Sequence, residues 1–284
     1  MHLVIQGLDI ATTDLKALAK LTQARTIEQR SAHAFVLVDA HTHPELAAYC
    51  ATAQLDFGVV PEARSITDFK LLVMDMDSTL ITMETIDELA DMVGIKPQVA
   101  AITAEAMRGE IDYDESLRRR LGLLKGLDAS ALDRVYAERL QLSPGALRLL
   151  TAARNAGIKT LLVSGGFSAI TERLQQQYHL DYTRANVLTV IDGKLTGEVT
   201  GQIVNAATKR ETLLDIAGQL GVTREQVIGV GDGANDLLFL AQCGVSVAYH
   251  AKPVVRTQTT YAINHAGLDG LLCLMDARAE APFG

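Results

Sequence analysis

The sequence predicts an α/β protein with three parts: a parallel sheet covered by helices, a helical insertion and a small N-terminal α+β unit. From residue 70 onward, short apolar stretches alternate with helical segments. Strands that are apolar on both faces and separated by helices are typical of a parallel sheet covered on both sides. Residues 84–140, dense in Ala, Leu, Glu and Arg, interrupt this alternation once. We therefore expect a helical cap at about 84–142, inserted in the sheet domain.

The N-terminal part has a pattern of its own. Strands are expected at 3–5, 25–30, 34–38 and 57–60, and helices at 15–21 and 44–53. The resulting order, βαββαβ, is that of a ferredoxin-like sandwich. Residues 61–68 are polar, which favours a linker. We therefore expect one domain over residues 1–66 and a second over residues 67–284.

The second domain carries the predicted parallel sheet. Gly157 follows a helical segment at a position where helices commonly end. Asp192-Gly193 indicates a tight hairpin turn between two short strands within residues 186–199. Strands of the sheet are expected at 70–74, 158–163, 227–230 and 245–248, and further helices at 167–178 and 209–220.

The composition is that of a globular chain. Of the 284 residues, 48% are apolar and 21% are charged, which suits a folded core and argues against disorder. The net charge of −8 gives no support to nucleic-acid binding. Cys50, Cys243 and Cys273 form no CxxC pair, and three such thiols are typical of a reducing compartment.

The sequence shows no targeting segment. The N-terminus lacks a basic stretch followed by an apolar one, and Asp9 and Asp14 come early. No apolar stretch approaches the roughly 20 residues that a membrane span needs. We therefore expect a cytoplasmic protein without a membrane partner.

Two carboxylates follow the first strand of the predicted sheet. Asp75 and Asp77 come directly after Leu71–Met74, and residues i and i+2 of an extended chain project to the same side. Two unit charges about 4 Å apart repel by roughly 4 kcal/mol at an effective dielectric constant of about 20. A divalent cation would turn this repulsion into attraction, and the repulsion itself would push Asp77 toward holding a proton. The pair therefore predicts a metal and catalytic site.

Two further loops are expected at the same edge of the sheet, where open α/β sheets bind ligands. Ser164-Gly165-Gly166 precedes a helix and suits an anion such as phosphate, although a plain strand-to-helix turn would also explain it. The loop 231–236 contributes Asp232, Asn235 and Asp236. Three such loops at one edge are hard to explain as ordinary turns.

Charged residues elsewhere carry weaker signals. Lys209 is expected near a helix start, where a cation is unfavourable because it opposes the helix dipole. Binding of a phosphate would explain a lysine at this position, and so would a solvated lysine on the surface. In Arg118-Arg119-Arg120, at least two side chains are expected on a solvated helix face. Glu84 is expected in a first helical turn, where an acid is favourable in any case.

Together these residues resemble the haloacid dehalogenase (HAD) superfamily of phosphotransferases, over about residues 70–276. The resemblance implies a Rossmann-like core and rests on the motifs at Asp75 and Asp77, at Ser164, at Lys209 and at 231–236. Within the superfamily, residues 113–120 and Glu84 resemble the cap segment and the substrate-contacting glutamate of the phosphoserine phosphatases. Residues 1–66 loosely resemble the ACT-like extension of the bacterial enzymes.

The resemblance implies a role for each residue. Asp75 would be the nucleophile that forms an aspartyl-phosphate, and Asp77 would protonate the leaving serine oxygen and then activate water. The remaining roles are phosphoryl binding by Ser164, Gly165 and Lys209, positioning by Asn235, Mg²⁺ binding by Asp75, Asp232 and the Asp77 backbone carbonyl, and orientation of this metal shell by Asp236.

The implied reaction is hydrolysis of O-phospho-L-serine to L-serine, the last step of serine biosynthesis. Glu84 and Arg120 would pair with the ammonium and the carboxylate of this substrate. Transfer of the phosphoryl group to another alcohol, such as homoserine, stays open, as does a homodimer. Two other classes remain: a signalling receiver that holds its phosphate for long, and an amino-acid-binding regulatory protein, suggested by residues 1–66.

Overall fold

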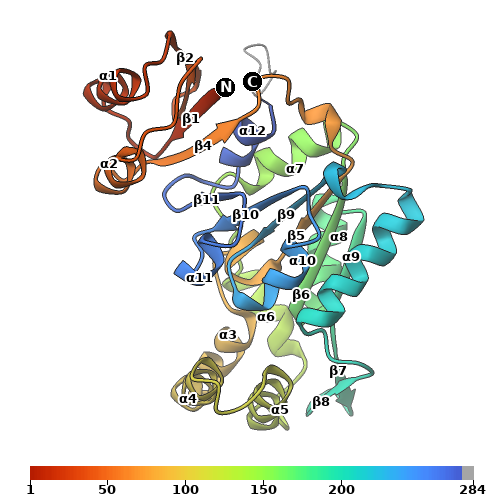
Figure 1. Cartoon of the computed structure of the whole chain (residues 1–284). Helices are drawn as coiled ribbons and strands as arrows, with labels where there is room; N and C mark the ends of the chain where they lie inside the picture. The colour runs from red at the N-terminus through yellow and green to blue at the C-terminus, as the bar shows by residue number, and fades with distance from the viewer. Residues whose placement is uncertain (277–284) are drawn as a thin grey trace. The chain divides into compact units, whose positions relative to one another are not determined.

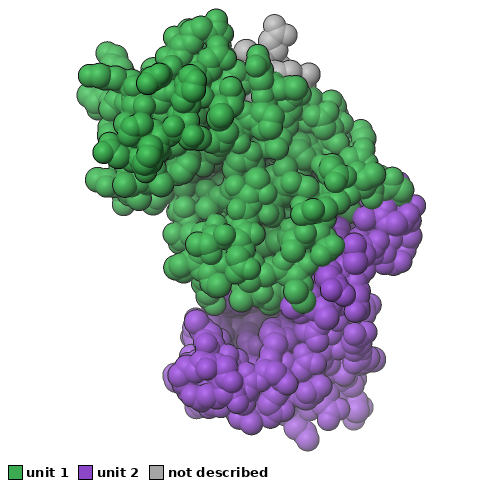
Figure 2. Space-filling model, in the orientation of Figure 1, with its two compact units in different colours: residues 1–72, 143–159, 221–284 green, residues 73–142, 160–220 purple. Residues whose placement is uncertain are grey.

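The computed structural model describes residues 1–276 (Figure 1). The chain divides into two compact units, which Figure 2 colours separately. Unit 1 takes residues 1–72, 143–159 and those from 221 onward; unit 2 takes residues 73–142 and 160–220. Each unit is described by itself. The eight residues that end the predicted domain 67–284 lie outside the described residues.

The N-terminal part of unit 1 has the expected order βαββαβ. Its sheet is antiparallel in the order β2-β3-β1-β4, which is the ferredoxin-like arrangement. Leu3, Ile5, Leu18 and Leu37 are among the buried residues of its core. The elements are β1 (His2–Gln6), α1 (Thr12–Leu21), β2 (Thr26–Ser31), β3 (Ala34–Val38), α2 (Leu46–Thr52) and β4 (Asp56–Val60).

A buried carboxylate ties this small sheet to the rest of unit 1. Asp56, at the start of β4, accepts hydrogen bonds from the backbone N–H groups of Asn264, His265 and Ala266 at 2.7, 2.9 and 2.9 Å. These residues follow β11 (Tyr261–Ile263), whose Tyr261 hydroxyl donates to the Val59 carbonyl at 2.7 Å. The N-terminal sheet is thus held to the rest of unit 1 by these polar contacts. The domain boundary after residue 66 stays a prediction.

The larger sheet has the strand order β11-β10-β9-β5-β6-β7-β8. Its pairings β10–β11, β9–β10 and β6–β7 are parallel, whereas β7 and β8 form the expected antiparallel hairpin. The division between the units falls within β5. The strands are β5 (Leu71–Met74), β6 (Lys159–Phe167), β7 (Tyr182–Ile191), β8 (Lys194–Thr200), β9 (Val227–Gly231), β10 (Val245–Tyr249) and β11.

The helices and turns of this α/β part agree with the sequence pattern in most places. Gly157, with φ +72°, follows α7, and Asp192 and Gly193 both have positive φ in the hairpin turn. Strand β11 was not predicted, because three residues without flanking turn signals carry no recognisable pattern. The helices are α7 (Ala146–Asn155), α8 (Ser168–Tyr178), α9 (Ala206–Leu220), α10 (Leu237–Leu240), α11 (Pro253–Arg256) and α12 (Gly270–Met275).

One predicted loop is wrong. Residues 164–166 were expected to form a turn after a strand ending at Val163, but β6 continues through them to Phe167. The pairing with β7 passes from Val163↔Arg184 to Phe167↔Asn186, so three residues of β6 lie opposite one residue of β7. Because pairing resumes at Phe167, this stretch is a bulge within the strand and not a loop.

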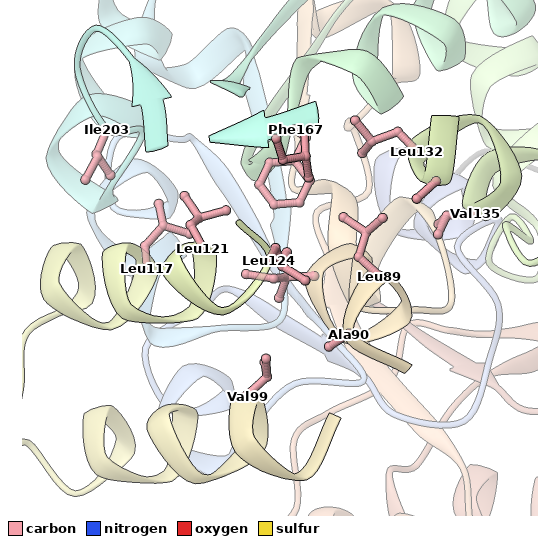
Figure 3. Packing of buried hydrophobic residues seen from close by; sticks show 13 residues of the cluster. Leu89, Ala90, Val99, Leu117, Leu121, Leu124, Leu132, Val135, Phe167 and Ile203 are labelled. Carbon is pink, nitrogen blue, oxygen red and sulfur yellow. The ribbon is translucent and has the colours of Figure 1, made fainter. Parts of the chain in front are cut away.

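The helical insertion lies in unit 2 and has its own apolar core. Figure 3 shows Leu89, Val99, Leu121 and Val135 among the cap residues that pack together with Phe167. Phe167 directly follows the bulge of β6, so the strand end that presents Ser164 is anchored in the cap core. The cap helices are α3 (Thr85–Met92), α4 (Lys96–Met107), α5 (Tyr113–Leu123) and α6 (Ser130–Glu138).

Within residues 1–276, the helices lack the length and the apolar character that crossing a membrane requires.

Candidate active site

A buried ion pair lies at the end of β5. The Lys209 ammonium nitrogen is 2.8 Å from Oδ1 of Asp75, and both side chains are almost completely removed from solvent. Lys209 is the fourth residue of α9, and its N–H donates to the Asn205 carbonyl at 2.9 Å. Burying a single charge is costly, whereas a close pair compensates much of that cost. The pair therefore places an ionised carboxylate beside a fixed cation.

The chain turns sharply after Asp75. Residues 76–80 form an irregular turn closed by the hydrogen bond from the Ile81 N–H to the Met76 carbonyl at 3.0 Å, and Ser78 within it has a left-handed backbone, with φ 56°. The Ser78 hydroxyl donates to Oε1 of Glu84 at 2.7 Å. Strand β5 ends at Met74 as predicted, and Asp75 and Asp77, which follow it, both have extended backbone angles (φ −70°, ψ 162° and φ −64°, ψ 135°).

Asp77 is held by the first residue of α3. Its Oδ1 accepts the Thr85 N–H at 3.1 Å and the Thr85 hydroxyl at 2.6 Å. Burial raises the pKa of Asp77 to about 7, and the negative charge of Glu84 adds to this increase. The hydrogen bonds from Thr85 and the positive charge of Lys209 lower the pKa but do not cancel the increase. The expected direction is confirmed; burial is the largest cause and the negative charge of Glu84 is the next.

The bulge of β6 brings backbone close to Asp77. The Gly166 N–H donates to the Ser164 hydroxyl oxygen at 2.8 Å, and Ser164 is fully buried. A Cβ atom at Gly166 would lie 2.7 Å from Oδ2 of Asp77, and one at Gly165 would clash with the Tyr113 hydroxyl. Glycine is thus required at both positions, because neighbouring side chains leave no room for a Cβ atom. The Ser164 hydroxyl oxygen accepts the Gly166 N–H, so its own proton can be donated to another acceptor.

The three consecutive arginines of the cap differ in exposure, as expected for neighbouring positions on a helix. Arg118 and Arg119 are exposed and pair with acidic side chains of the cap. Arg120 is partly buried, and its Nε donates to the Ser116 carbonyl at 3.3 Å. The Tyr113 hydroxyl donates to the Gly165 carbonyl at 3.4 Å, and burial raises the pKa of Tyr113 to about 12. Glu84, the N-cap residue of α3, is exposed.

The third predicted loop lies in unit 1, after β9. The buried carboxylate of Asp236 accepts the backbone N–H groups of Asp232 at 3.1 Å and of Gly233 at 3.0 Å. Asp232 and Asn235 stay partly exposed. The loop is thus shaped from within by Asp236, as expected for a residue that supports Asp232 from behind.

Among the described residues, three aspartates offer carboxylate oxygens as possible metal ligands: Asp75, Asp232 and Asp236. All of their side-chain donors are carboxylate oxygens. Hard cations such as Mg²⁺ and Ca²⁺ prefer such ligands, whereas zinc sites commonly include nitrogen or sulfur. The donor set therefore fits a hard divalent cation.

Two residues of the site, Thr85 and Asn186, were not predicted from the sequence. Thr85, which holds Asp77, resembles any residue at the start of a helix. Asn186 is buried in β7, where its amide nitrogen donates to the Gly165 carbonyl at 2.8 Å. The one available signal was an asparagine in a predicted strand, since asparagine is depleted in strands.

Comparisons with known proteins agree with this geometry. The protein-family model of the haloacid dehalogenase-like hydrolases matches residues 69–244. The family model of a domain of unknown function (DUF4072) matches residues 3–46. The phosphoserine phosphatase of a Polaromonas species is 54% identical over 215 residues, which cover 74% of this chain and 91% of the relative.

Solved structures are similar as well. A probable phosphoserine phosphatase from Vibrio cholerae matches with a TM-score of 0.85 and 35% identity, covering 97% of this chain and 86% of that one. A substrate-bound phosphoserine phosphatase complex matches with a TM-score of 0.68 and 37% identity, covering 72% of this chain and 97% of that one. The chain belongs to the haloacid dehalogenase-like hydrolases and, within them, to the phosphoserine phosphatase family.

The close approach at Gly166 gives a testable prediction. We expect Gly166→Ala to lower kcat by about 100-fold, because a methyl group there must displace Asp77, and a shift of about 1 Å can have such an effect. Steady-state kinetics measure this loss.

A matched control is Gly218→Ala in α9, where an added Cβ meets no atom within 4 Å. It should keep full activity and stabilise the protein by about 0.5–1 kcal/mol, since alanine is favoured over glycine inside helices. Full activity of Gly166→Ala would contradict the described contact with Asp77.

Proposed function

We propose that this member of the phosphoserine phosphatase family hydrolyses O-phospho-L-serine with Asp75 as the nucleophile. The observation that carries the proposal is the buried pair of Asp75 and Lys209, at 2.8 Å. A carboxylate beside a buried ammonium stays ionised and able to attack, and the same ammonium can neutralise a phosphoryl oxygen.

The first step is an in-line displacement at phosphorus. An Asp75 oxygen forms a bond to phosphorus while the bond from phosphorus to the serine oxygen breaks. The products are an aspartyl-phosphate and a serine oxygen that needs a proton. Asp77 supplies that proton, since a carboxyl group with a pKa of about 7 is partly protonated near neutral pH.

The second step uses the same two residues in reverse roles. Asp77, now deprotonated, takes a proton from a water molecule, whose oxygen attacks phosphorus. The bond between phosphorus and Asp75 breaks, phosphate leaves, and Asp77 carries its proton again. Thr85, which donates two hydrogen bonds to Oδ1 of Asp77, fixes the orientation of this carboxyl group through both steps.

The phosphoryl oxygens are held by groups of unit 2. The Ser164 hydroxyl, the Gly165 N–H and the Lys209 ammonium provide three donors on neighbouring elements, β6 and α9. Such preorganised donors stabilise the charge that shifts in the transition state. Asn235, from unit 1, is assigned to positioning of the substrate or the intermediate.

The cofactor of the proposal is Mg²⁺. Asp75 and Asp232 would supply carboxylate ligands, the Asp77 backbone carbonyl a further oxygen, and Asp236 would orient Asp232. When bound, the cation neutralises charge on the phosphoryl group and on Asp75.

Substrate selection is assigned to the cap. Glu84 would pair with the ammonium of phosphoserine and Arg120 with its carboxylate. Arg120 is the partly buried member of the three consecutive arginines, whereas Arg118 and Arg119 already pair with cap acids. Transfer to another alcohol, such as homoserine, is the alternative; free phosphate or phosphohomoserine as product separates the two.

The remaining assignments stay predictions. These are a cytoplasmic location, a homodimer, and a regulatory role for the ACT-like residues 1–66. A signalling receiver is no longer needed as an interpretation, because the chain belongs to a family of hydrolases.

Metal removal tests the cofactor. We expect chelation to abolish phosphate release and Mg²⁺ to restore it. Asp232→Asn should raise the Mg²⁺ concentration for half-maximal activity by at least about 10-fold, because it removes a charged ligand. The control is Asp215→Asn in α9, whose exposed carboxylate accepts a hydrogen bond from the Gln219 amide at 2.9 Å and should leave this concentration unchanged. Full activity in chelator would refute the metal role.

Charge matching in the cap is tested by comparing substrates. Arg120→Ala should lower kcat/KM for phosphoserine by about 10- to 100-fold, since a charge-assisted hydrogen bond contributes about 1.5–3 kcal/mol. The loss for p-nitrophenyl phosphate, which has no carboxylate, should be within about twofold. Arg119→Ala, an exposed neighbour, is the control and should affect neither substrate. Equal losses on both substrates would count against the assignment of Arg120.

A further inference from the structure

The bulge in β6 interrupts the pairing with β7 at the Gly165 carbonyl. Pairing with β7 stops at Val163 and resumes at Phe167, so the Gly165 carbonyl lies where no backbone N–H of β7 is in register. A buried carbonyl without a partner is costly. Two side chains donate to it instead: the Asn186 amide at 2.8 Å and the Tyr113 hydroxyl at 3.4 Å.

The orientation of the Asn186 amide is fixed by its partners. Its nitrogen faces the Gly165 carbonyl, which only accepts, and its oxygen accepts the Val204 N–H at 2.8 Å, which only donates. A flipped amide would lose both bonds. Asn186 is 1% exposed, so water does not replace these bonds. The two contacts therefore act as a rigid link between residues 165 and 204.

Each end of this link continues into the phosphate-binding groups. The Gly165 carbonyl and the Gly166 N–H belong to one peptide plane, and that N–H donates to the Ser164 hydroxyl. Fixing the carbonyl therefore fixes the direction in which Ser164 offers its own proton.

At the other end, Val204 precedes the start of α9. The Asn205 side chain accepts the Thr208 N–H at 3.1 Å, and the Asn205 carbonyl accepts the Lys209 N–H at 2.9 Å. Val204 thus leads directly into the turn that places Lys209 beside Asp75.

We propose that Asn186 is a positioning residue that holds the Ser164–Gly166 bulge and the Lys209 turn in register around the phosphoryl group. The inference rests on the proposed phosphate-binding role of Ser164, Gly165 and Lys209. It adds that one buried amide sets the distance between the two elements that carry them.

The test separates phosphate binding from serine binding. In Asn186→Asp the shape is kept, but an acceptor faces the Gly165 carbonyl, so the link to the bulge is lost. We expect kcat with phosphoserine to fall by at least about 10-fold and competitive inhibition by inorganic phosphate to weaken by at least about 10-fold. Inhibition by L-serine, which the cap residues are proposed to hold, should change less than about twofold.

A matched control is Thr160→Val, near the start of β6. The Thr160 hydroxyl is buried and donates to Asp181 at 3.1 Å, far along β6 from Ser164. Its loss should lower the melting temperature as a buried hydrogen bond does, without changing either inhibition constant. If Asn186→Asp does not fold, Asn186→Ser, which removes the reach to Gly165 without adding a charge, provides the same comparison.

Unchanged kcat and phosphate inhibition in a folded Asn186 variant would overturn the proposal, as would equal losses of phosphate and L-serine affinity, because those would indicate a general disturbance. Lys209→Gln is measured alongside. If Lys209→Gln is inactive while the Asn186 variants are normal, only the positioning role fails; if Lys209→Gln is also fully active, the proposed phosphate site itself fails.

Discussion

The site depends on the buried ion pair between Lys209 and Asp75. Removing one partner of such a pair commonly costs about 3–5 kcal/mol, because the other charge is left buried and uncompensated. Apolar residues of similar size would often stabilise a core more. The pair is therefore better explained by the proposed chemistry, in which an ionised Asp75 attacks phosphorus and Lys209 binds a phosphoryl oxygen, than by stability alone.

The rest of unit 2 positions this pair. Strand β6 carries the bulge at Ser164 and then anchors Phe167 in the apolar core of the cap (Figure 3). The amide of Asn186 connects that bulge to the turn before Lys209. The proposed catalytic groups, the cap and the proposed phosphate-binding backbone are thus connected by packing and hydrogen bonds, which is what preorganised electrostatic stabilisation requires.

The sequence predicted the strands, the cap and the ends of the strands that carry acids, because apolar stretches and Asp or Gly clusters are local signals. Backbone geometry was harder. The sequence indicates a loop at residues 164–166, whereas the structure has a bulge there, because continuation of the strand depends on pairing with β7 that resumes at Phe167. The direction of the Asp77 pKa shift was predicted from the sequence, whereas the contributions of burial and of Glu84 were not, because both are tertiary features. Thr85 and Asn186 were not predicted for the same reason, since no sequence motif connects Thr85 with Asp77 or Asn186 with Gly165 and Val204.

The proposed two-step reaction requires that Asp75 carries the phosphoryl group between the steps. The direct measurement is acid quenching during turnover of labelled phosphoserine, followed by peptide mapping by mass spectrometry. We expect a phosphoryl group on Asp75 that disappears in Asp75→Asn, which should stay folded and inactive. Phosphate release without any labelled enzyme, or a label on another residue such as Ser164, would contradict it.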